Sequence, residues 1–249
     1  MRLSQGHLNL LALCLRKFQY VYLDQIGGMA AETPQQAWGS QFHQLMLQQD
    51  LGLSVLPAEP DLARCFSALQ SSAPQLFDPA LDRQSEYRLS VPLENHSLVV
   101  VYDRLVLAGN RATIYDWKTY ARPPTADQLA QSWQTRLYLY VLAEAGPYPP
   151  EALSMIYWFV RLTPDHPAPR SVSLSYSAAQ HRQTHVDLTD CLRQIDQGLA
   201  QYPQRPFPKL PPTAAACETC PFAVCCDRLP SQRQTQRLLS VEDAAEVSI

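Results

Sequence analysis

The sequence predicts an α/β fold in which a mixed central sheet is flanked by helices. Short runs rich in valine, leucine, isoleucine and tyrosine gather between residues 86 and 118, and turn residues separate them, as is typical of neighbouring strands. Longer stretches on either side carry apolar residues at 3- and 4-residue spacings, which indicates amphipathic helices. The chain has 249 residues, 46% of them hydrophobic, which is enough for one domain with a sizeable core.

We expect this single domain to cover residues 1–229, with a flexible polar tail over residues 230–249. Residues 1–80 are expected to form its N-terminal helical part and residues 81–200 its core. Residues 201–229 are expected to form the segment that carries the cysteines. The helical part should contain helices over residues 3–24, about 35–49 and 61–71. Gly27-Gly28 and Pro34 separate the first two of these helices, because glycine and proline interrupt helical stretches.

Three strands are expected next, over Glu86–Leu93, Leu98–Leu107 and Ala112–Lys118. Glu94-Asn95 and Gly109-Asn110 are the turns between them, and an antiparallel meander is the simplest arrangement. A helix over residues 126–145 follows and stops at Gly146-Pro147. Two further strands are expected over Met155–Leu162 and Ser171–Tyr176, and a last helix over residues 178 to about 199. A proline-rich segment then leads to the cysteines.

Composition excludes several classes of protein. The formal net charge of -3 argues against a general nucleic-acid coat protein but leaves room for a local basic groove. No apolar run approaches the ~20 residues of a membrane span. Polar residues interrupt the apolar stretch Leu8–Leu15, and Arg16-Lys17 follow it without a cleavage site, so we expect a cytoplasmic protein. No phosphate-binding loop of an ATP-driven motor occurs in the sequence.

Acidic residues and one lysine lie on neighbouring predicted strands. Asp116 and Lys118 share a face of the third strand because strand side chains alternate. Asp103 interrupts an apolar run, where an acid is costly to bury unless it is paired or binds a metal. Converging carboxylates could hold Mg²⁺ or Mn²⁺ for phosphodiester hydrolysis, and Glu86 could add another. A salt bridge at the strand end would also explain the Asp-x-Lys pair.

Four of the seven cysteines crowd together, at Cys217, Cys220, Cys225 and Cys226. Without a secretory signal this spacing indicates a metal site before it indicates disulfides. Three close thiolates and a fourth ligand could hold Zn²⁺ or an iron–sulfur cluster. Unliganded thiols are the remaining alternative.

Four motifs together resemble the RecB-like branch of the PD-(D/E)XK nucleases. They are Gly39-Ser-Gln-Phe-His43, Asp103, Asp116-Trp-Lys118 and Gln134-Thr-Arg-Leu-Tyr138, in the order and spacing of that branch. The resemblance implies a restriction-endonuclease-like core with a metal on His43, Asp103, Asp116 and the Trp117 carbonyl. It also implies that Lys118 is the catalytic lysine and that Gln134 and Tyr138 contact DNA. The Gln-x-x-x-Tyr motif can also be aligned two residues further on, in which case Arg136 and Tyr140 would contact DNA instead.

The cysteines resemble those of the iron–sulfur subgroup of this branch, which includes AddB and the CRISPR adaptation nucleases. Cys14-Leu-Arg-Lys-Phe matches the N-terminal cysteine motif, although Leu15 stands where relatives often have proline. Cys217, Cys220 and Cys226 match the C-terminal set. The resemblance therefore implies a [4Fe–4S] cluster that joins the two ends of the domain, with structural Zn²⁺ as the alternative.

We therefore expect a metal-dependent DNA nuclease, an exonuclease acting on single strands or duplex ends. Arg16 and Lys17 lie beside aromatic residues and could contact DNA, or they could be solvated cations of an ordinary helix. The alternative function is a non-catalytic DNA-binding adaptor that works with a helicase or a CRISPR-adaptation partner. A zinc-stabilised interaction protein is a third, weaker hypothesis.

Overall fold

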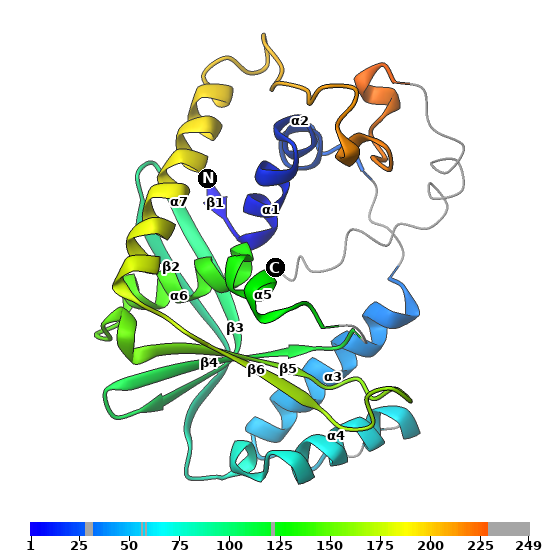
Figure 1. The fold of residues 1–249 in the computed structure, drawn as a ribbon, viewed down its shortest axis with the longest axis vertical. Helices are drawn as coiled ribbons and strands as arrows, with labels where there is room; N and C mark the ends of the chain where they lie inside the picture. The colour runs from blue at the N-terminus through cyan, green and yellow to red at the C-terminus, as the bar shows by residue number, and fades with distance from the viewer. Residues whose placement is uncertain (28–31, 56, 58, 121–122, 229–249) are drawn as a thin grey trace. The chain divides into compact units, whose positions relative to one another are not determined.

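The computed structural model describes residues 1–27, 32–55, 57, 59–120 and 123–228 (Figure 1). The expected tail over residues 230–249 lies outside them. Two compact units divide the chain. Met1–Thr33, Leu93–His96 and Asp187–Ile249 form the first unit, and Pro34–Pro92 and Ser97–Val186 form the second.

The second unit contains a mixed sheet, which confirms the predicted α/β class. Its strands are β2 (Asp82–Leu93), β3 (His96–Ala108), β4 (Arg111–Lys118), β5 (Leu153–Phe159) and β6 (Arg170–Ser175). Strand β3 pairs with both β2 and β4, β4 pairs with β5, and β5 pairs with β6. The β3–β4 and β5–β6 pairs are antiparallel, whereas β4 and β5 are parallel. Both predicted turns fall between strands, and positive φ angles at Glu94 and Gly109 make these reversals tight.

Helices cover both faces of this sheet (Figure 1). On one face α3 (Pro34–Asp50), α4 (Pro60–Ser72) and a 3₁₀ turn (Pro74–Phe77) share an apolar core with strand residues such as Trp117 and Trp158. On the other face, α6 (Trp133–Ala145) packs against β5. Burial of the aromatic and aliphatic side chains in these layers is the main force that holds them on the sheet.

The helix expected over residues 126–145 is divided in two. Helix α5 (Ala126–Gln131) ends at Ser132, whose ψ of 145° is extended, and α6 begins at the next residue. The Ser132 hydroxyl accepts a hydrogen bond from the Thr135 backbone N–H at 3.2 Å, so it caps α6. This break places Gln134 in the first turn of α6.

The first unit joins the N-terminal helices to the C-terminal cysteine segment. A short strand β1 (Arg2–Leu3) precedes α1 (Gln5–Leu13), α2 (Leu15–Phe18) and a π-helical turn (Gln19–Leu23). The helix expected over residues 3–24 is therefore wrong in detail, because Cys14 is extended and interrupts it. Helix α7 (Ala178–Leu199), which belongs to this unit from Asp187 on, leads to 3₁₀ turns at Ala215–Cys217 and Val224–Cys226.

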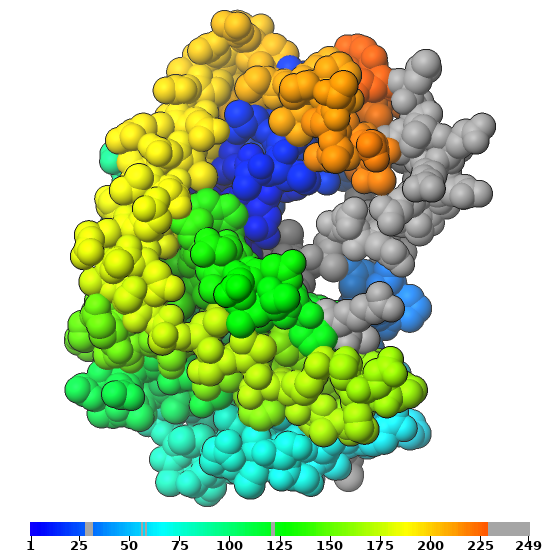
Figure 2. Space-filling model, viewed as in Figure 1, coloured from blue at the N-terminus to red at the C-terminus, as the bar shows by residue number. Residues whose placement is uncertain are grey.

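Hydrogen bonds hold this C-terminal segment on the N-terminal helices. Arg16 Nε donates to the Phe207 carbonyl at 2.6 Å, and the Tyr20 hydroxyl donates to the Cys225 carbonyl at 2.6 Å. Figure 2 shows the two segments side by side, in blue and orange. Within the described residues, no helix combines the length and apolar character that crossing a membrane requires.

Candidate metal centre and cysteine pocket

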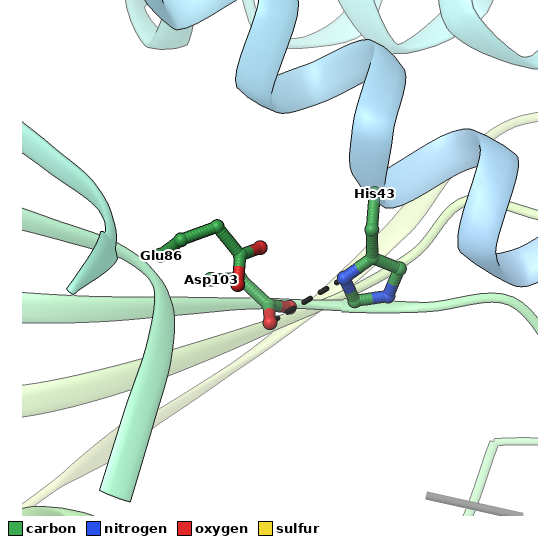
Figure 3. Close-up of side chains that lie close together, drawn as sticks. All are labelled: His43, Glu86 and Asp103. Atoms are coloured by element: carbon green, nitrogen blue, oxygen red, sulfur yellow. Dashed lines mark ion pairs between the residues drawn. The ribbon is translucent and has the colours of Figure 1, made fainter. Parts of the chain in front are cut away.

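Three of the predicted site residues converge in the second unit. His43 comes from α3, Glu86 from β2 and Asp103 from β3, and each offers a ligand atom within 4.8 Å of the others. Figure 3 shows the three side chains pointing toward one another. Among the described residues, this is the one group of three or more histidine, cysteine or acidic ligands with such spacing. An imidazole and two carboxylates suit a hard divalent cation.

A glycine lets α3 approach the sheet closely enough for His43 to take part. A Cβ atom on Gly39 would lie 2.9 Å from Thr119 Oγ1, closer than real Cβ contacts allow. Thr119 directly follows β4, and His43 lies one helical turn beyond Gly39, on the same side of α3. The glycine of the Gly-x-x-x-His motif is therefore required sterically: it leaves room for Thr119, so that the turn carrying His43 can lie against the sheet.

Glu86 reaches the group through an unusual backbone conformation. Its φ of 49° lies in the left-handed region, which is uncommon for a residue other than glycine within a strand. Such conformations cost about 1–3 kcal/mol and persist where the surroundings impose them. This one accompanies a carboxylate directed at His43 and Asp103.

His43 bridges Asp103 and the backbone of β4. Its Nδ1 lies 3.4 Å from Asp103 Oδ1, and its Nε2 lies 3.0 Å from the Trp117 carbonyl oxygen. Asp103 Oδ2 accepts a hydrogen bond from the Trp117 backbone N–H at 2.7 Å. Since both neighbours of the imidazole are acceptors, the doubly protonated ring satisfies both of its nitrogens.

Electrostatics agree with this protonation state. Burial alone would lower the pKa of His43, but Asp103, together with Asp116, raises it to about 9. Burial alone would raise the pKa of Asp103, yet His43, the Trp117 N–H and Lys118 bring it below its ordinary value. Desolvation and the nearby Asp103 carboxylate raise the pKa of Glu86. A cation placed among these groups would replace the positive charge of the imidazolium.

Asp116 and Lys118 form a neighbouring pair, buried at 3% and 5% exposure. Lys118 Nζ lies 3.0 Å from Asp116 Oδ2, and the Gln134 side-chain amide donates to Asp116 Oδ1 at 2.5 Å. The predicted set of metal ligands is therefore divided: Asp116 is held by Lys118 and Gln134, and Glu86 lies with His43 and Asp103 instead.

Tyr157 is a supporting residue that inspection of the sequence did not single out. It lies opposite Asp116 in the parallel β4–β5 register, and Lys118 Nζ lies 5.7 Å from its ring centroid. Its hydroxyl is 2.8 Å from Thr135 Oγ1 on α6. The strands before and after α6 pair in parallel, and a sequence analysis that assumed this pairing would have placed Tyr157 beside Asp116.

The residues expected to contact DNA occupy different environments. Tyr138 is 8% exposed and packs edge-on against Tyr102. The Arg136 guanidinium lies over the Trp133 ring, 4.5 Å from its centroid. Tyr140 is 1% exposed, and its hydroxyl is 2.8 Å from His185 Nδ1, so it takes part in the packing of α6 and α7. Of the two competing registers, the structure brings the first to the acids: Gln134 bonds Asp116, and Asp116 and Asp103, after burial itself, raise the pKa of Tyr138.

All four predicted cluster cysteines line one pocket in the first unit. They are Cys14, Cys217, Cys220 and Cys226. Lys17, Tyr20 and Arg228 line the same pocket, and an Arg228 N–H donates to Cys217 Sγ. All seven cysteines are among the described residues, and none of them forms a disulfide. Arg16, by contrast, is engaged with Phe207 and Tyr20, its Nη1 lying 3.4 Å from the Tyr20 hydroxyl.

A mixed sheet that carries acids and a lysine on adjacent strands, close to a histidine and a further carboxylate, is an arrangement suited to phosphodiester hydrolysis assisted by a divalent cation. A profile of the PD-(D/E)XK nuclease superfamily matches residues 2–227. The chain belongs to this superfamily.

Solved structures align with this chain at low sequence identity. A protein of Eubacterium rectale, provisionally described as an exonuclease, aligns with a TM-score of 0.52 and 13% identity, over 96% of this chain and 92% of that chain. An alkaline exonuclease of Laribacter hongkongensis aligns with a TM-score of 0.38 and 11% identity, over 82% and 92% of the two chains. No curated protein matches the sequence.

Proposed function

We propose that this nuclease is a deoxyribonuclease of the RecB-like branch that depends on Mg²⁺ or Mn²⁺ and acts as an exonuclease on single strands or duplex ends. The observation that carries the proposal is the convergence of His43, Glu86 and Asp103 within 4.8 Å. The buried Asp116–Lys118 pair lies on the adjacent strand β4. The site therefore offers metal ligands together with a lysine that could act in catalysis.

His43, Asp103 and the Trp117 carbonyl would hold the metal, with Asp116 as the further ligand in the RecB-like pattern and Glu86 as an additional carboxylate. When bound, the ion supplies Lewis-acid activation of the phosphate and a lowered pKa for a water molecule. The Trp117 N–H fixes the orientation of Asp103. His43 gives up one proton to become a ligand, because metal-bound imidazole is neutral.

Lys118 is the proposed catalytic lysine. Its ammonium nitrogen lies 3.0 Å from Asp116 Oδ2 and faces the Tyr157 ring in a position that is 5% exposed. Positive charge at this point would offset the negative charge that builds on the phosphate during attack. Gln134 fixes the other oxygen of Asp116, which keeps the pair in one arrangement.

The cysteine pocket is proposed to hold a [4Fe–4S] cluster. Its four cysteine ligands are those of the iron–sulfur subgroup. A zinc site needs sulfur atoms about 3.8 Å apart, given tetrahedral Zn–S bonds of about 2.3 Å. Four thiolates around one pocket are the ligand number of either group, so the metal content of the purified protein decides between them.

DNA contacts are proposed for Arg136, stacked on Trp133, and for Gln134 and Tyr138 beside the acids. Lys17 would contribute from the cysteine pocket. A helicase or a CRISPR-adaptation protein is the proposed class of partner.

The test is cleavage of 5′- and 3′-labelled single-stranded and duplex DNA by anaerobically purified protein in Mn²⁺ or Mg²⁺. Lys118→Gln should lower kcat by about 10²–10⁴-fold, because it removes the charge that acts on the phosphate. Arg193→Gln removes one positive charge from an exposed i,i+3 pair and serves as the matched control. Circular dichroism verifies that both variants are folded.

Each outcome has a distinct meaning. Cleavage by the wild type and Arg193→Gln alone establishes the nuclease, and the label released first gives its polarity. Undiminished cleavage by Lys118→Gln removes Lys118 from the mechanism. DNA binding without cleavage by cluster-loaded, metal-loaded protein would instead favour the non-catalytic adaptor.

A further inference from the structure

Asp50 is a buried carboxylate that no part of the proposed chemistry uses. It is the last residue of α3, and its side chain is 5% exposed. Arg104 of β3, whose side chain is fully buried, grips it with two bonds: Nε lies 2.8 Å from Oδ2, and Nη2 lies 2.5 Å from Oδ1. Arg104 Nη1 also donates to the Leu76 carbonyl at 3.0 Å. This bidentate geometry fixes both distance and angle between α3 and β3.

Strand β2 contributes to the same carboxylate. Arg83 Nε lies 3.2 Å from Asp50 Oδ1, and the Ser85 hydroxyl donates to Asp50 Oδ2. Asp50, Arg83, Ser85 and Arg104 are called the Asp50 network below. Ser85 directly precedes Glu86, just as Arg104 directly follows Asp103.

The network thus joins the three elements that carry the candidate metal ligands. Helix α3 carries His43, β2 carries Glu86 and β3 carries Asp103. Successive residues of a regular strand point to opposite faces, so Arg104 points away from Asp103. Ser85 bonds Asp50 and is not part of the ligand group. Asp50 therefore acts on the site only through the backbones of these elements.

A second contact couples the network to β4. The Arg104 guanidinium lies over the Trp117 ring, 4.9 Å from its centroid. The backbone of Trp117 in turn bonds Asp103 through its N–H and His43 through its carbonyl. Helix α3 and strands β2, β3 and β4 therefore all contact the buried Asp50–Arg104 ion pair.

We propose that Asp50 is a positioning residue that sets the spacing of His43, Glu86 and Asp103 and thereby the affinity of the metal site. This inference rests on the proposed metal-binding function. A merely structural ion pair would change the stability of the fold, whereas a positioning residue changes metal affinity in protein that remains folded.

The experiment compares Mn²⁺ binding by wild type and Asp50→Asn, measured by titration calorimetry and by the electron paramagnetic resonance signal of free Mn²⁺. We expect the Kd to rise about tenfold in Asp50→Asn, the lower end of what loss of an outer-shell partner causes. Asp190→Asn makes the same chemical change in the exposed pair with Arg193, and Leu69→Ala destabilises the core. Both controls should bind Mn²⁺ like the wild type at temperatures where they are folded.

An unchanged Kd in folded Asp50→Asn would overturn the proposal, as would an equal weakening in Leu69→Ala. If Asp50→Asn does not fold, Ser85→Ala removes only the bond from β2 and carries the same test, with a severalfold rise in Kd expected and an unchanged Kd overturning it. Failure of the wild type to bind Mn²⁺ would contradict the proposed function itself, which separates the two ideas.

Discussion

At the scale of single residues, the proposed metal ligand His43 is also a titratable group. The imidazole lies between two acceptors, Asp103 and the Trp117 carbonyl, and its raised pKa of about 9 keeps it charged at neutral pH. A metal ion bound by His43 would compete with this proton for the same nitrogen lone pair. The metal-free site therefore carries its own positive charge, which a bound cation displaces.

Metal affinity should consequently increase with pH. Without a metal, the pKa of His43 is raised from its ordinary 6.5 to about 9. Between these two pH values the imidazole is therefore protonated, and a metal ion that binds to it must release one proton. We expect the Mn²⁺ association constant to rise roughly tenfold per pH unit over this range and to level off above it. Calorimetry at pH 7.5 in two buffers of different ionisation enthalpy should show about one proton released per ion.

His43→Gln supplies the control for this prediction. It keeps a hydrogen-bonding side chain but cannot hold a proton, so its weaker binding should release about none. An association constant of the wild type that stays flat from pH 6.5 to 8.5 would contradict the assignment of His43 as a ligand.

At the scale of elements, the close approach of α3 to the end of β4 depends on Gly39. Helix propensity alone predicts that Gly39→Ala stabilises α3 by about 1 kcal/mol. The added Cβ would lie 2.9 Å from Thr119 Oγ1, however, so α3 must shift away from the sheet. Since His43 lies on that side of the helix, we expect Mn²⁺ affinity to fall by up to roughly tenfold.

Removing the obstructing hydroxyl should reverse the effect. Gly39→Ala/Thr119→Ala is expected to restore the Mn²⁺ Kd to near the wild-type value, with Thr119→Ala alone as the baseline. Wild-type affinity in Gly39→Ala would show that the helix does not need this close contact.

The elements also show how far the sequence could predict the structure. Residue periodicity located the strands and the principal helices, because burial of one face imposes the same spacing in every fold. The helix breaks at Cys14 and Ser132 were not predicted, since neither is a glycine or proline. One break adjoins the cysteine pocket, and the other arises from a hydroxyl cap.

The site could be predicted only in part, for a related reason. Motif spacing indicated His43 and Asp103, which the structure brings together, and the place of Glu86 on the preceding predicted strand indicated it as a further acid. The left-handed conformation of Glu86 leaves no local signal, because no glycine or asparagine stands there. The bonds of Asp50 to Ser85 and Arg104 span 35 and 54 residues, and no single-sequence pattern records such pairs.

At the scale of the whole molecule, the cysteine pocket joins the two ends of the described chain. Cys14 comes from the N-terminal helices, and the other three cysteines come from the last described turns. A shared inorganic group would close a loop of about 200 residues, which removes conformational freedom from the unfolded chain. The proposed group would therefore serve the stability of the fold more than the chemistry of cleavage.

Adjacent cysteines allow this role to be tested by one pair of variants. Cys226 lines the pocket, whereas Cys225 is exposed and does not. We expect Cys226→Ser to lose the visible absorption of the cluster, to retain well under four iron atoms per chain, and to melt at lower temperature. Cys225→Ser should keep all three properties, because Cys225 is exposed and does not line the pocket. Equal iron content in the two variants would exclude Cys226 as a ligand, and zinc in place of iron in anaerobically purified wild type would assign the pocket to a structural zinc ion.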